Sequence, residues 1–372
     1  MASAITSPAI IHRGAGVFSK IPEEAGRLGD RALIVTGGHM HGSGRLLRLI
    51  NLIEDLGVDT FVSEPIASEP TVDMIDELAV FAKQHGCDVV IAIGGGSVMD
   101  AAKAAALMIT NPGKTEDYQL KRRNIEAAPV AQVFAPTTSG TGSEATRVSV
   151  LTNTDIGVKR SISDPRMTPE VVVLDPQLTA SCDKYLTTIT AMDAFAHAIE
   201  SAVSTKSNAY TRHIALAAIE QLSAGLPRCQ SDPDDLDARL QCQTGACFAG
   251  LAMQEGLGAS HSLAPAACIV GDIRHSEAVG ALLPHVIRLN LRENPGVYDQ
   301  VKRAMDCTDV AGCLEKWCSE GGFANSLSVL GLEPSDWPEV KEVMGRYASH
   351  RQTNPVEVTD DYARELFELS IS

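Results

Sequence analysis

The chain has 372 residues, 44% hydrophobic and 21% charged, and this is too long for one small core, so we expect two domains. Its 31 basic and 47 acidic residues give a formal charge of −16, which argues against nucleic acid or an anionic membrane as the main partner. No apolar run approaches the roughly 20 residues of a membrane span, and the start lacks the basic and apolar regions expected of a signal peptide.

The first half alternates between short apolar runs and helical periods. The predicted strands are residues 32–36, 60–62, 88–93, 130–135 and 171–174, and the predicted helices are 46–56, 72–85 and 97–108. Because the strands are apolar throughout, we expect a parallel sheet that is covered on both faces. Residues 1–179 are therefore predicted to form an α/β domain.

After residue 180 the strand-like runs disappear and long helical periods follow. These periods are residues 186–203, 208–225, 234–255, 277–292, 298–306, 310–320, 338–348 and 360–370. They predict an all-helical second domain over residues 180–372. Residues 229–236, with the sequence CQSDPDDL, are expected to form a solvated acidic loop.

Two glycine-rich stretches follow predicted strands. Gly94-Gly95-Gly96-Ser97 ends one strand and opens a helix, where free N–H groups and the helix dipole favour an anion. The stretch does not match G-x-G-x-x-G, and alone it could be a tight turn. The second stretch, TTSGTGSE at 137–144, also lies at a strand end, where open α/β sheets bind ligands. Together they suit a pyrophosphate, whereas Lys103 and Lys114 are expected to be solvated at the surface.

A carboxylate and three histidines are candidate metal ligands. Asp193 and His197 are four residues apart in a predicted helix, so both face the same way, although an isolated pair is more often a buried histidine bonded to an aspartate. His261 and His275 would complete a shell that suits Fe²⁺ or Zn²⁺, and the alternative is that they are ordinary helix residues. An open position on such a metal would polarise an alcohol or carbonyl oxygen. We assign His285 to structure or to the lining of a pocket.

Several segments resemble one known family. They are GGGSVMDAAKAAAL, PTTSGTGSEATRVSVLT, DP-x-LT at 175–179, AMDAFAHAIES, HSLAPAACIVGDIRHSEAVGALLPHVIRLN and TNPVEVTDDYARELFELS. In order and spacing they resemble the iron-dependent (group III) alcohol dehydrogenases over nearly the whole chain. The resemblance implies an N-terminal Rossmann-like NAD(P)-binding domain and a C-terminal helical metal-binding domain, with the active site in the cleft between them.

The resemblance also assigns site residues. It makes Asp193, His197, His261 and His275 the metal ligands, and we take His261 and His275 as catalytic. The cofactor-binding residues that we expect are Gly37, Gly94, Gly95, Gly96, Ser97, Asp100, Thr137, Thr138, Ser139, Thr141, Gly142, Ser143 and Lys159.

The chain departs from the common family pattern at three places. Pro265 stands where many members have a second histidine, and His275 is followed by Ser276 where glycine is usual. Gly37 stands where strictly NAD-dependent members often carry an aspartate that repels a 2′-phosphate, so NADP(H) is admissible. Pro265 cannot donate a proton and is expected to interrupt the helix after His261. Bulk water is then the first choice of proton source, ahead of Glu277 and His285.

We therefore expect a metal-dependent, NAD(P)-linked alcohol dehydrogenase that runs as an aldehyde reductase, with Fe²⁺ or Zn²⁺ as the metal. Arg147, Lys159, Arg160 or Arg274 would favour an anionic aldehyde such as phosphonoacetaldehyde. The alternatives are polyol oxidation as in zinc glycerol dehydrogenases, a non-redox cyclase of the dehydroquinate synthase type, and an inactive nucleotide-binding protein. Nine scattered cysteines without a C-x-x-C pair indicate reduced thiols. We expect a cytoplasmic homodimer.

Overall fold

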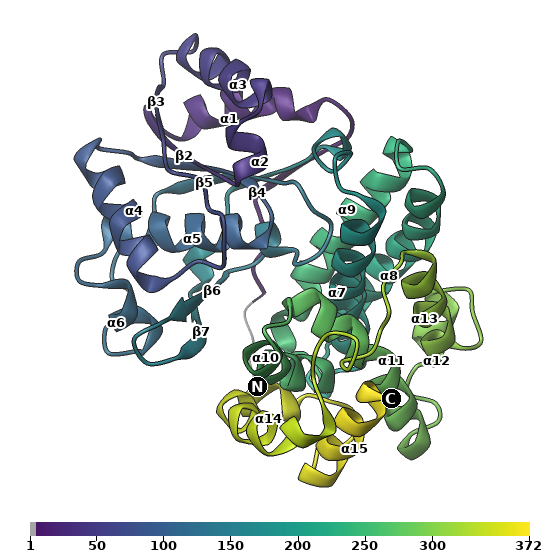
Figure 1. The fold of residues 1–372 in the computed structure, drawn as a ribbon. Coiled ribbons are helices and arrows are strands. Elements are labelled where there is room, and N and C mark those ends of the chain that lie inside the picture. The colour runs from purple at the N-terminus through teal and green to yellow at the C-terminus, as the bar shows by residue number, and fades with distance from the viewer. Residues whose placement is uncertain (1–4) are drawn as a thin grey trace. The chain divides into compact units, whose positions relative to one another are not determined.

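The computed structural model describes residues 5–372, without the side chains of residues 347–349. The chain forms two compact units. One comprises the residues up to Thr138 together with Ser143–Thr179, and the other comprises Ser139–Gly142 together with Ala180–Ser372. The first unit is α/β and the second is helical (Figure 1), which confirms the expected fold class.

The first unit is built on a parallel sheet of six strands. Their order across the sheet is β1 (Ile10–Arg13), β8 (Val171–Leu174), β5 (Ala131–Pro136), β4 (Val89–Gly94), β2 (Arg31–Thr36) and β3 (Asp59–Val62). Every neighbouring pair is parallel. The strand β1 was not predicted, because its four residues, IIHR, include only two apolar ones and carry no strong strand signal.

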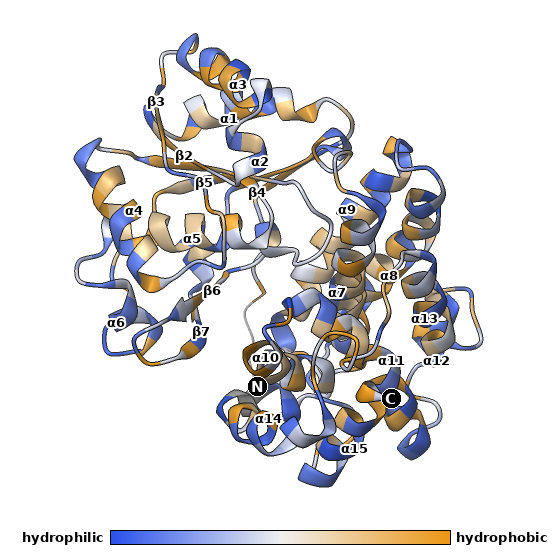
Figure 2. Cartoon of the chain, in the orientation of Figure 1, coloured by the Kyte–Doolittle hydropathy of each residue, from blue (hydrophilic) through white to orange (hydrophobic). Residues whose placement is uncertain are grey.

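Helices cover both faces of this sheet. On one face Ala32 and Ile34 pack with α1 (Ile21–Leu28) and α3 (Gly44–Glu54). On the other face Leu33 and Val35 pack with α4 (Val72–Gln84) and α5 (Gly96–Thr110). The alternation of side chains along β2 therefore serves two cores, which is why the strand is apolar throughout. Figure 2 shows this hydrophobic character along β2, β4 and β5.

Three smaller elements complete the first unit. They are α2 (Gly38–His41), α6 (Thr115–Gln119) and a hairpin of β6 (Val148–Asn153) and β7 (Val158–Ser163). The hairpin is antiparallel and separate from the main sheet. Alternate residues of β6 are buried, so this strand has the half-buried pattern that a search for wholly apolar runs overlooks.

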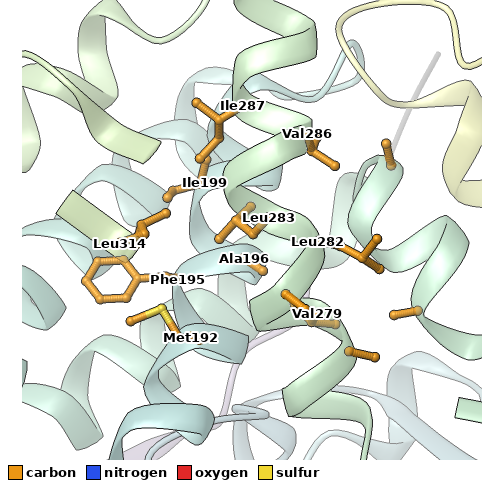
Figure 3. Close-up of a cluster of buried hydrophobic side chains, with 14 of the residues drawn as sticks. Met192, Phe195, Ala196, Ile199, Val279, Leu282, Leu283, Val286, Ile287 and Leu314 are labelled. Atoms are coloured by element: carbon orange, nitrogen blue, oxygen red, sulfur yellow. The ribbon is translucent and has the colours of Figure 1, made fainter. Parts of the chain in front are cut away.

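The second unit is a bundle of helices around one core. Its helices are α7 (Lys184–Val203), α8 (Ala209–Ser231), α9 (Leu236–Ala252), α10 (Ala259–Gly271), α11 (His275–Glu293), α12 (Asp299–Ala304), α13 (Val310–Glu320), α14 (Trp337–Met344) and α15 (Asp360–Ile371). Figure 3 shows the core between α7 and α11, where Met192, Phe195 and Ile199 lie among Leu283 and Ile287. Among the described residues, no helix is both long and apolar enough to cross a membrane.

The helix α8 ends six residues later than predicted. α8 continues through Gly225 and Pro227 to Ser231, so the first residues of the predicted acidic loop are helical and Cys229 is buried. Packing explains this, because a Cβ on Gly225 would lie 2.8 Å from the carbonyl oxygen of Ala238, and the bare glycine lets α9 approach closely.

The expected break after His261 is also wrong. α10, which was not among the predicted helices, runs through Pro265 as far as Gly271. Pro265 has no N–H to donate to the carbonyl of His261, four residues earlier. The helix nevertheless persists, since the residues around Pro265 are packed into the core of the helical unit.

A candidate metal centre and a candidate nucleotide site

The helix α7 places three ionisable side chains on one face. Asp193, His197 and Glu200 are spaced at i, i+4 and i+7, which aligns them along a helix. The helix is fixed at its start by Asp183, whose side chain accepts a hydrogen bond of 2.7 Å from the amide of Leu186. All three side chains are buried.

The four candidate ligands of the sequence analysis come together around Asp193. Its Oδ1 lies 3.8 Å from Nε2 of His197, 3.7 Å from Nε2 of His261 on α10 and 3.8 Å from Nε2 of His275, the first residue of α11. Ligand atoms of Asp193, His261 and His275 all lie within 4.8 Å of one another. The side chain of His275 is 32% exposed, whereas the other three are at most 7% exposed, so solvent reaches the cluster at His275.

The spacing and bonding of these atoms suit a divalent cation. Distances of 3.7–3.8 Å are too long for hydrogen bonds. A tetrahedral ion with bonds of about 2.1 Å would hold its ligand atoms about 3.4 Å apart. In addition, Oδ1 of Asp193 and Nε2 of His261 are buried without a hydrogen-bond partner among the residues that the structure describes. Such orphaned polar atoms are costly unless something binds them, and a metal would bind both.

The protonation states follow from burial and from the neighbouring charges. Burial alone would raise the pKa of Asp193, but His197, His261 and His275 hold it well below its usual value. Burial lowers the pKa of His197 to about 4, despite the opposing effect of Asp193. Burial would also lower the pKa of His261, but contacts with Asp193 and Glu200 raise it to about 9. Without a metal, the cluster therefore contains an ionised Asp193, a neutral His197 and, at neutral pH, a protonated His261. A cation that binds Nε2 of His261 would displace the proton there, so metal binding should weaken as the pH falls.

Two residues of the cluster were missed by the sequence analysis. Oε2 of Glu200 lies 2.7 Å from Nδ1 of His261. The ring of His350 lies with its centroid 6.4 Å from that of His261, and burial lowers the pKa of His350 to about 4. A charged residue at i+7 from Asp193 in an apolar helix was a signal for Glu200. His350, 89 residues beyond His261 in the 3₁₀ helix Gly345–Gln352, gave none.

The two alternative proton donors, Glu277 and His285, have neighbours of their own. Oε1 of Glu277 accepts a hydrogen bond of 2.8 Å from the hydroxyl of Tyr185. His285 is half-buried near Arg288 and Glu315, and burial lowers its pKa. The structure thus accounts for both residues through contacts of their own.

In the first unit, the candidate nucleotide-binding residues gather where β2, β4 and β5 end. A Cβ on Gly95 would lie 3.4 Å from Oγ1 of Thr138, and the amide of Thr137 donates to the carbonyl of Gly94. A Cβ on Gly37 would lie 3.6 Å from Val98, near the start of α5. These stretches therefore adjoin at the carboxyl edge of the sheet, beside the N-terminus of α5.

Gly94 is required by packing within this turn. A Cβ there would lie 2.6 Å from the Cβ of Val98, which real side chains do not tolerate. The bare backbone keeps the turn from β4 into α5 tight, and α5 begins at Gly96, directly before Ser97. Free amides at this helix start are available to an anion.

Lys103 is buried, so the expectation that it is solvated is wrong. Its ammonium donates to the carbonyl of Ser143 at 2.9 Å, to the hydroxyl of Ser143 at 2.7 Å and to the hydroxyl of Thr146 at 2.9 Å. Oδ1 of Asp100 in turn accepts a 2.5 Å hydrogen bond from Ser143. These polar partners satisfy the buried charge and tie the end of the second glycine-rich stretch to α5. Lys114 is exposed.

The other predicted cofactor residues have different surroundings. Ser139–Gly142 belongs to the helical unit, where Gly140 packs on Thr190 of α7. Lys159 is partly exposed and forms an ion pair with Glu69.

Comparison with known proteins agrees with this arrangement. Residues 8–176 match the family described as iron-containing alcohol dehydrogenase, and residues 187–370 match the C-terminal part of the Fe-containing alcohol dehydrogenase family. The chain belongs to the iron-containing alcohol dehydrogenase family. The resemblance noted in the sequence is thereby confirmed, and the protein is an oxidoreductase of the alcohol and aldehyde class.

Individual relatives extend along most of the chain. The 4-hydroxybutyrate dehydrogenase of Cupriavidus necator is 32% identical, covering 97% of this chain and 98% of its own. The NAD-dependent methanol dehydrogenase of Bacillus methanolicus is 32% identical, covering 75% of this chain and 73% of its own. The solved sulfoacetaldehyde reductase of Bifidobacterium kashiwanohense, in complex with NAD⁺, has a TM-score of 0.90 at 29% identity and covers 100% of this chain and 99% of its own.

Proposed function

We propose that the protein reduces a small aldehyde to its alcohol, with hydride supplied by a nicotinamide cofactor at a metal centre made by Asp193, His197, His261 and His275. The observation that carries this proposal is a pair of buried polar atoms, Oδ1 of Asp193 and Nε2 of His261, that lie 3.7 Å apart without a hydrogen-bond partner among the described residues. The same Oδ1 lies 3.8 Å from Nε2 of His197 and of His275. A divalent cation bound there would act as a Lewis acid on the substrate oxygen. Fe²⁺ and Zn²⁺ both suit the donor set.

The chain's own groups would supply orientation and charge. Three buried ligands would fix one side of the ion, and the exposed edge at His275 leaves room for the substrate. The turn from Gly94 to Ser97 and the threonines Thr137 and Thr138 would hold the pyrophosphate and nucleosides of NAD(H) or NADP(H). We take residues 1–179 as the cofactor-binding domain and residues 180–372 as the metal-binding domain.

We propose an anionic substrate. The relatives named for 4-hydroxybutyrate and for sulfoacetaldehyde act on molecules that carry a carboxylate or a sulfonate at one end. In this chain the exposed Arg274 directly precedes the candidate ligand His275. A guanidinium at this place suits an anionic group a few atoms away from the aldehyde carbonyl. A phosphonate such as phosphonoacetaldehyde belongs to the same class.

The proposal is tested by a screen of small aldehydes with both reduced cofactors, after loading with Fe²⁺ or Zn²⁺. We expect metal-dependent oxidation of NADH or NADPH, with higher kcat/KM for anionic than for neutral aldehydes of equal length. Replacing Arg274 with Gln should remove that preference and leave the rates for neutral aldehydes within about threefold. Equal kcat/KM for both classes would refute the anionic substrate, and metal-independent turnover would refute the metal centre.

The alternatives make different predictions in the same assays. Polyol oxidation with zinc would give NAD⁺-dependent turnover of glycerol in preference to aldehyde reduction. The family assignment to oxidoreductases displaces the non-redox cyclase. We also propose a homodimer, for which sedimentation at micromolar concentration should give twice the chain mass of 39.5 kDa.

A further inference from the structure

Glu200 is a buried carboxylate with a full set of hydrogen-bond donors. It is 2% exposed and lies on α7, seven residues after Asp193. Oε1 accepts from the amide of Ser260 at 2.8 Å and from the hydroxyl of the same residue. Oε2 accepts from the amide of Gly258 at 2.8 Å and faces Nδ1 of His261 at 2.7 Å. The group therefore joins the helix that carries Asp193 to the start of the helix that carries His261.

Capping of α10 alone does not explain a charged residue here. The amides of Gly258 and Ser260 belong to the start of that helix, where the neutral oxygens of Ser, Thr and Asn are common caps. An ionised carboxylate buried in this way costs several kcal/mol of desolvation. The remaining partner is Nδ1 of His261, whose other nitrogen lies 3.7 Å from Asp193. The contact that specifically requires the negative charge of Glu200 is therefore the one with the imidazole of His261.

We propose that Glu200 is a positioning residue of the metal centre, which holds His261 as the tautomer with its proton on Nδ1 and its Nε2 lone pair aimed at the ion. This inference rests on the proposed metal centre. A neutral imidazole carries one ring proton, and a carboxylate at Nδ1 keeps that proton there, since the carboxylate only accepts. The second nitrogen is then available to a cation, and the nearby charge makes it a stronger donor.

Glutamine at position 200 would disturb this arrangement while keeping the volume of the side chain. With its amide NH₂ in the place of Oε2, it faces His261 and the N–H of Gly258. The ring must then accept at Nδ1, so its proton moves to Nε2 and points at the ion. With the amide turned over, its NH₂ meets the N–H of Ser260 instead. In either orientation one contact that the carboxylate satisfies becomes repulsive.

The experiment measures the affinity of the full chain for Zn²⁺ by competition with a chromogenic chelator. We expect Glu200→Gln to raise the Kd by about 10–100-fold. Ser260→Ala is the matched control, since it removes a hydrogen bond to the same carboxylate but leaves the charge and the contact with His261. Its Kd should stay within about threefold of the wild-type value. A Kd of Glu200→Gln equal to that of Ser260→Ala would overturn the proposal.

A second measurement tests the tautomer without altering Glu200. In the zinc-loaded wild type, labelled with ¹⁵N-histidine, we expect a low-field Nδ1–H resonance that is absent from His261→Ala. A folded, zinc-loaded wild type in which His261 carries no proton on Nδ1 would overturn the proposal, even if Glu200→Gln fails to fold. If His261→Ala binds zinc like the wild type, the proposed metal centre itself fails. If His261→Ala loses zinc but Glu200→Gln does not, the role of Glu200 fails and the centre stands.

Discussion

Gly142 and Gly250 meet backbone against backbone. Gly142 has a left-handed φ of +60°, and a Cβ built on it would lie 2.8 Å from both the Cα and the nitrogen of Gly250 on α9. The loop Ser139–Gly142 therefore contacts α9 at a point where neither Gly142 nor Gly250 has a side chain. Since this loop is the middle of a predicted cofactor-binding stretch, we expect its contact with α9 to affect cofactor affinity.

We expect Gly250→Ala to displace the loop Ser139–Gly142 from α9. We expect a loss of about 1–3 kcal/mol in the free energy of unfolding, because the added methyl overlaps the backbone of Gly142. The KM for the nicotinamide cofactor should rise as well. The checks are urea unfolding and steady-state kinetics. Gly44→Ala is the control, since a Cβ there meets no atom within 4 Å and should leave both quantities unchanged.

His261→Ala and His275→Ala should each lose the metal. Outer partners of a ligand change metal affinity by about 10–100-fold, so removal of a ligand should cost more than about 100-fold, with a matching loss of kcat. Metal analysis after gel filtration and circular dichroism give the occupancy and the fold. His213→Ala, an exposed histidine on α8, should retain the metal. Wild-type metal content in either variant would show that the replaced histidine is not a metal ligand.

Gly37→Asp should shift cofactor preference towards NADH. The φ at Gly37 is −84°, which any residue can adopt, and a Cβ there makes only ordinary contact with Val98. The new carboxylate would repel a 2′-phosphate, so the NADPH/NADH ratio of kcat/KM should fall by about tenfold, or about 1.4 kcal/mol. Gly44→Asp adds the same charge at the start of α3 and should leave the ratio unchanged. An unaltered ratio in Gly37→Asp would place residue 37 away from the adenosine ribose.

Pro265→His should change kcat by less than tenfold if bulk water supplies the proton. A positioned donor typically contributes about 10²–10⁴-fold, so a larger gain at neutral pH would mean that the centre lacks a relay. Pro265→Ala separates the two parts of this change, because it restores the N–H to the helix without an imidazole. The comparison of kcat for the two variants, at equal metal content, isolates the effect of the ring.

The metal-free protein should lose stability as the pH falls from about 6.5 towards 4, in part through His350. Burial lowers its pKa to about 4, assisted by His261 and His197 and opposed by Glu200. Below pH 6.5 the unfolded chain takes up this proton before the folded chain does, so folding weakens, and the contribution is on the order of 2 kcal/mol. His350→Gln should flatten the pH dependence of urea unfolding in this window, and His213→Gln should not. Parallel profiles for wild type and His350→Gln would contradict the assignment.

Local patterns predicted most of the elements. The runs at Val89–Gly94 and Val171–Leu174 are apolar because both faces of the sheet are covered, and this is visible in the sequence alone. The hairpin of β6 and β7 escaped because its strands are half-buried. The continuation of α8 past Gly225 depends on the approach of α9, and no local pattern contains that packing.

The four candidate ligands of the metal centre could be named from the sequence, but the residues that hold them in place could not. Asp193 and His197 share a helix face through their spacing, His261 and His275 were candidates as later histidines, and the family resemblance assigned all four as ligands. The partners of these residues come from distant parts of the chain. Glu200 meets His261 across 61 positions, and the burial of Lys103 depends on carbonyls 40 and 45 positions away. Contacts of this kind arise from tertiary packing, which periodicity does not record.

The unequal exposure of the four candidate ligands bears on the rates at which a metal ion binds and leaves, as well as on its affinity. Asp193 and His197 lie inside α7, and His261 is buried in the first turn of α10, whereas His275 is the first residue of α11 and is partly exposed. Helix termini fray before helix interiors do. An ion in this centre would therefore enter and leave past His275, and its residence time would depend on how often the first turn of α11 opens. Two preparations with equal Kd could then differ widely in the time that a chelator needs to strip them.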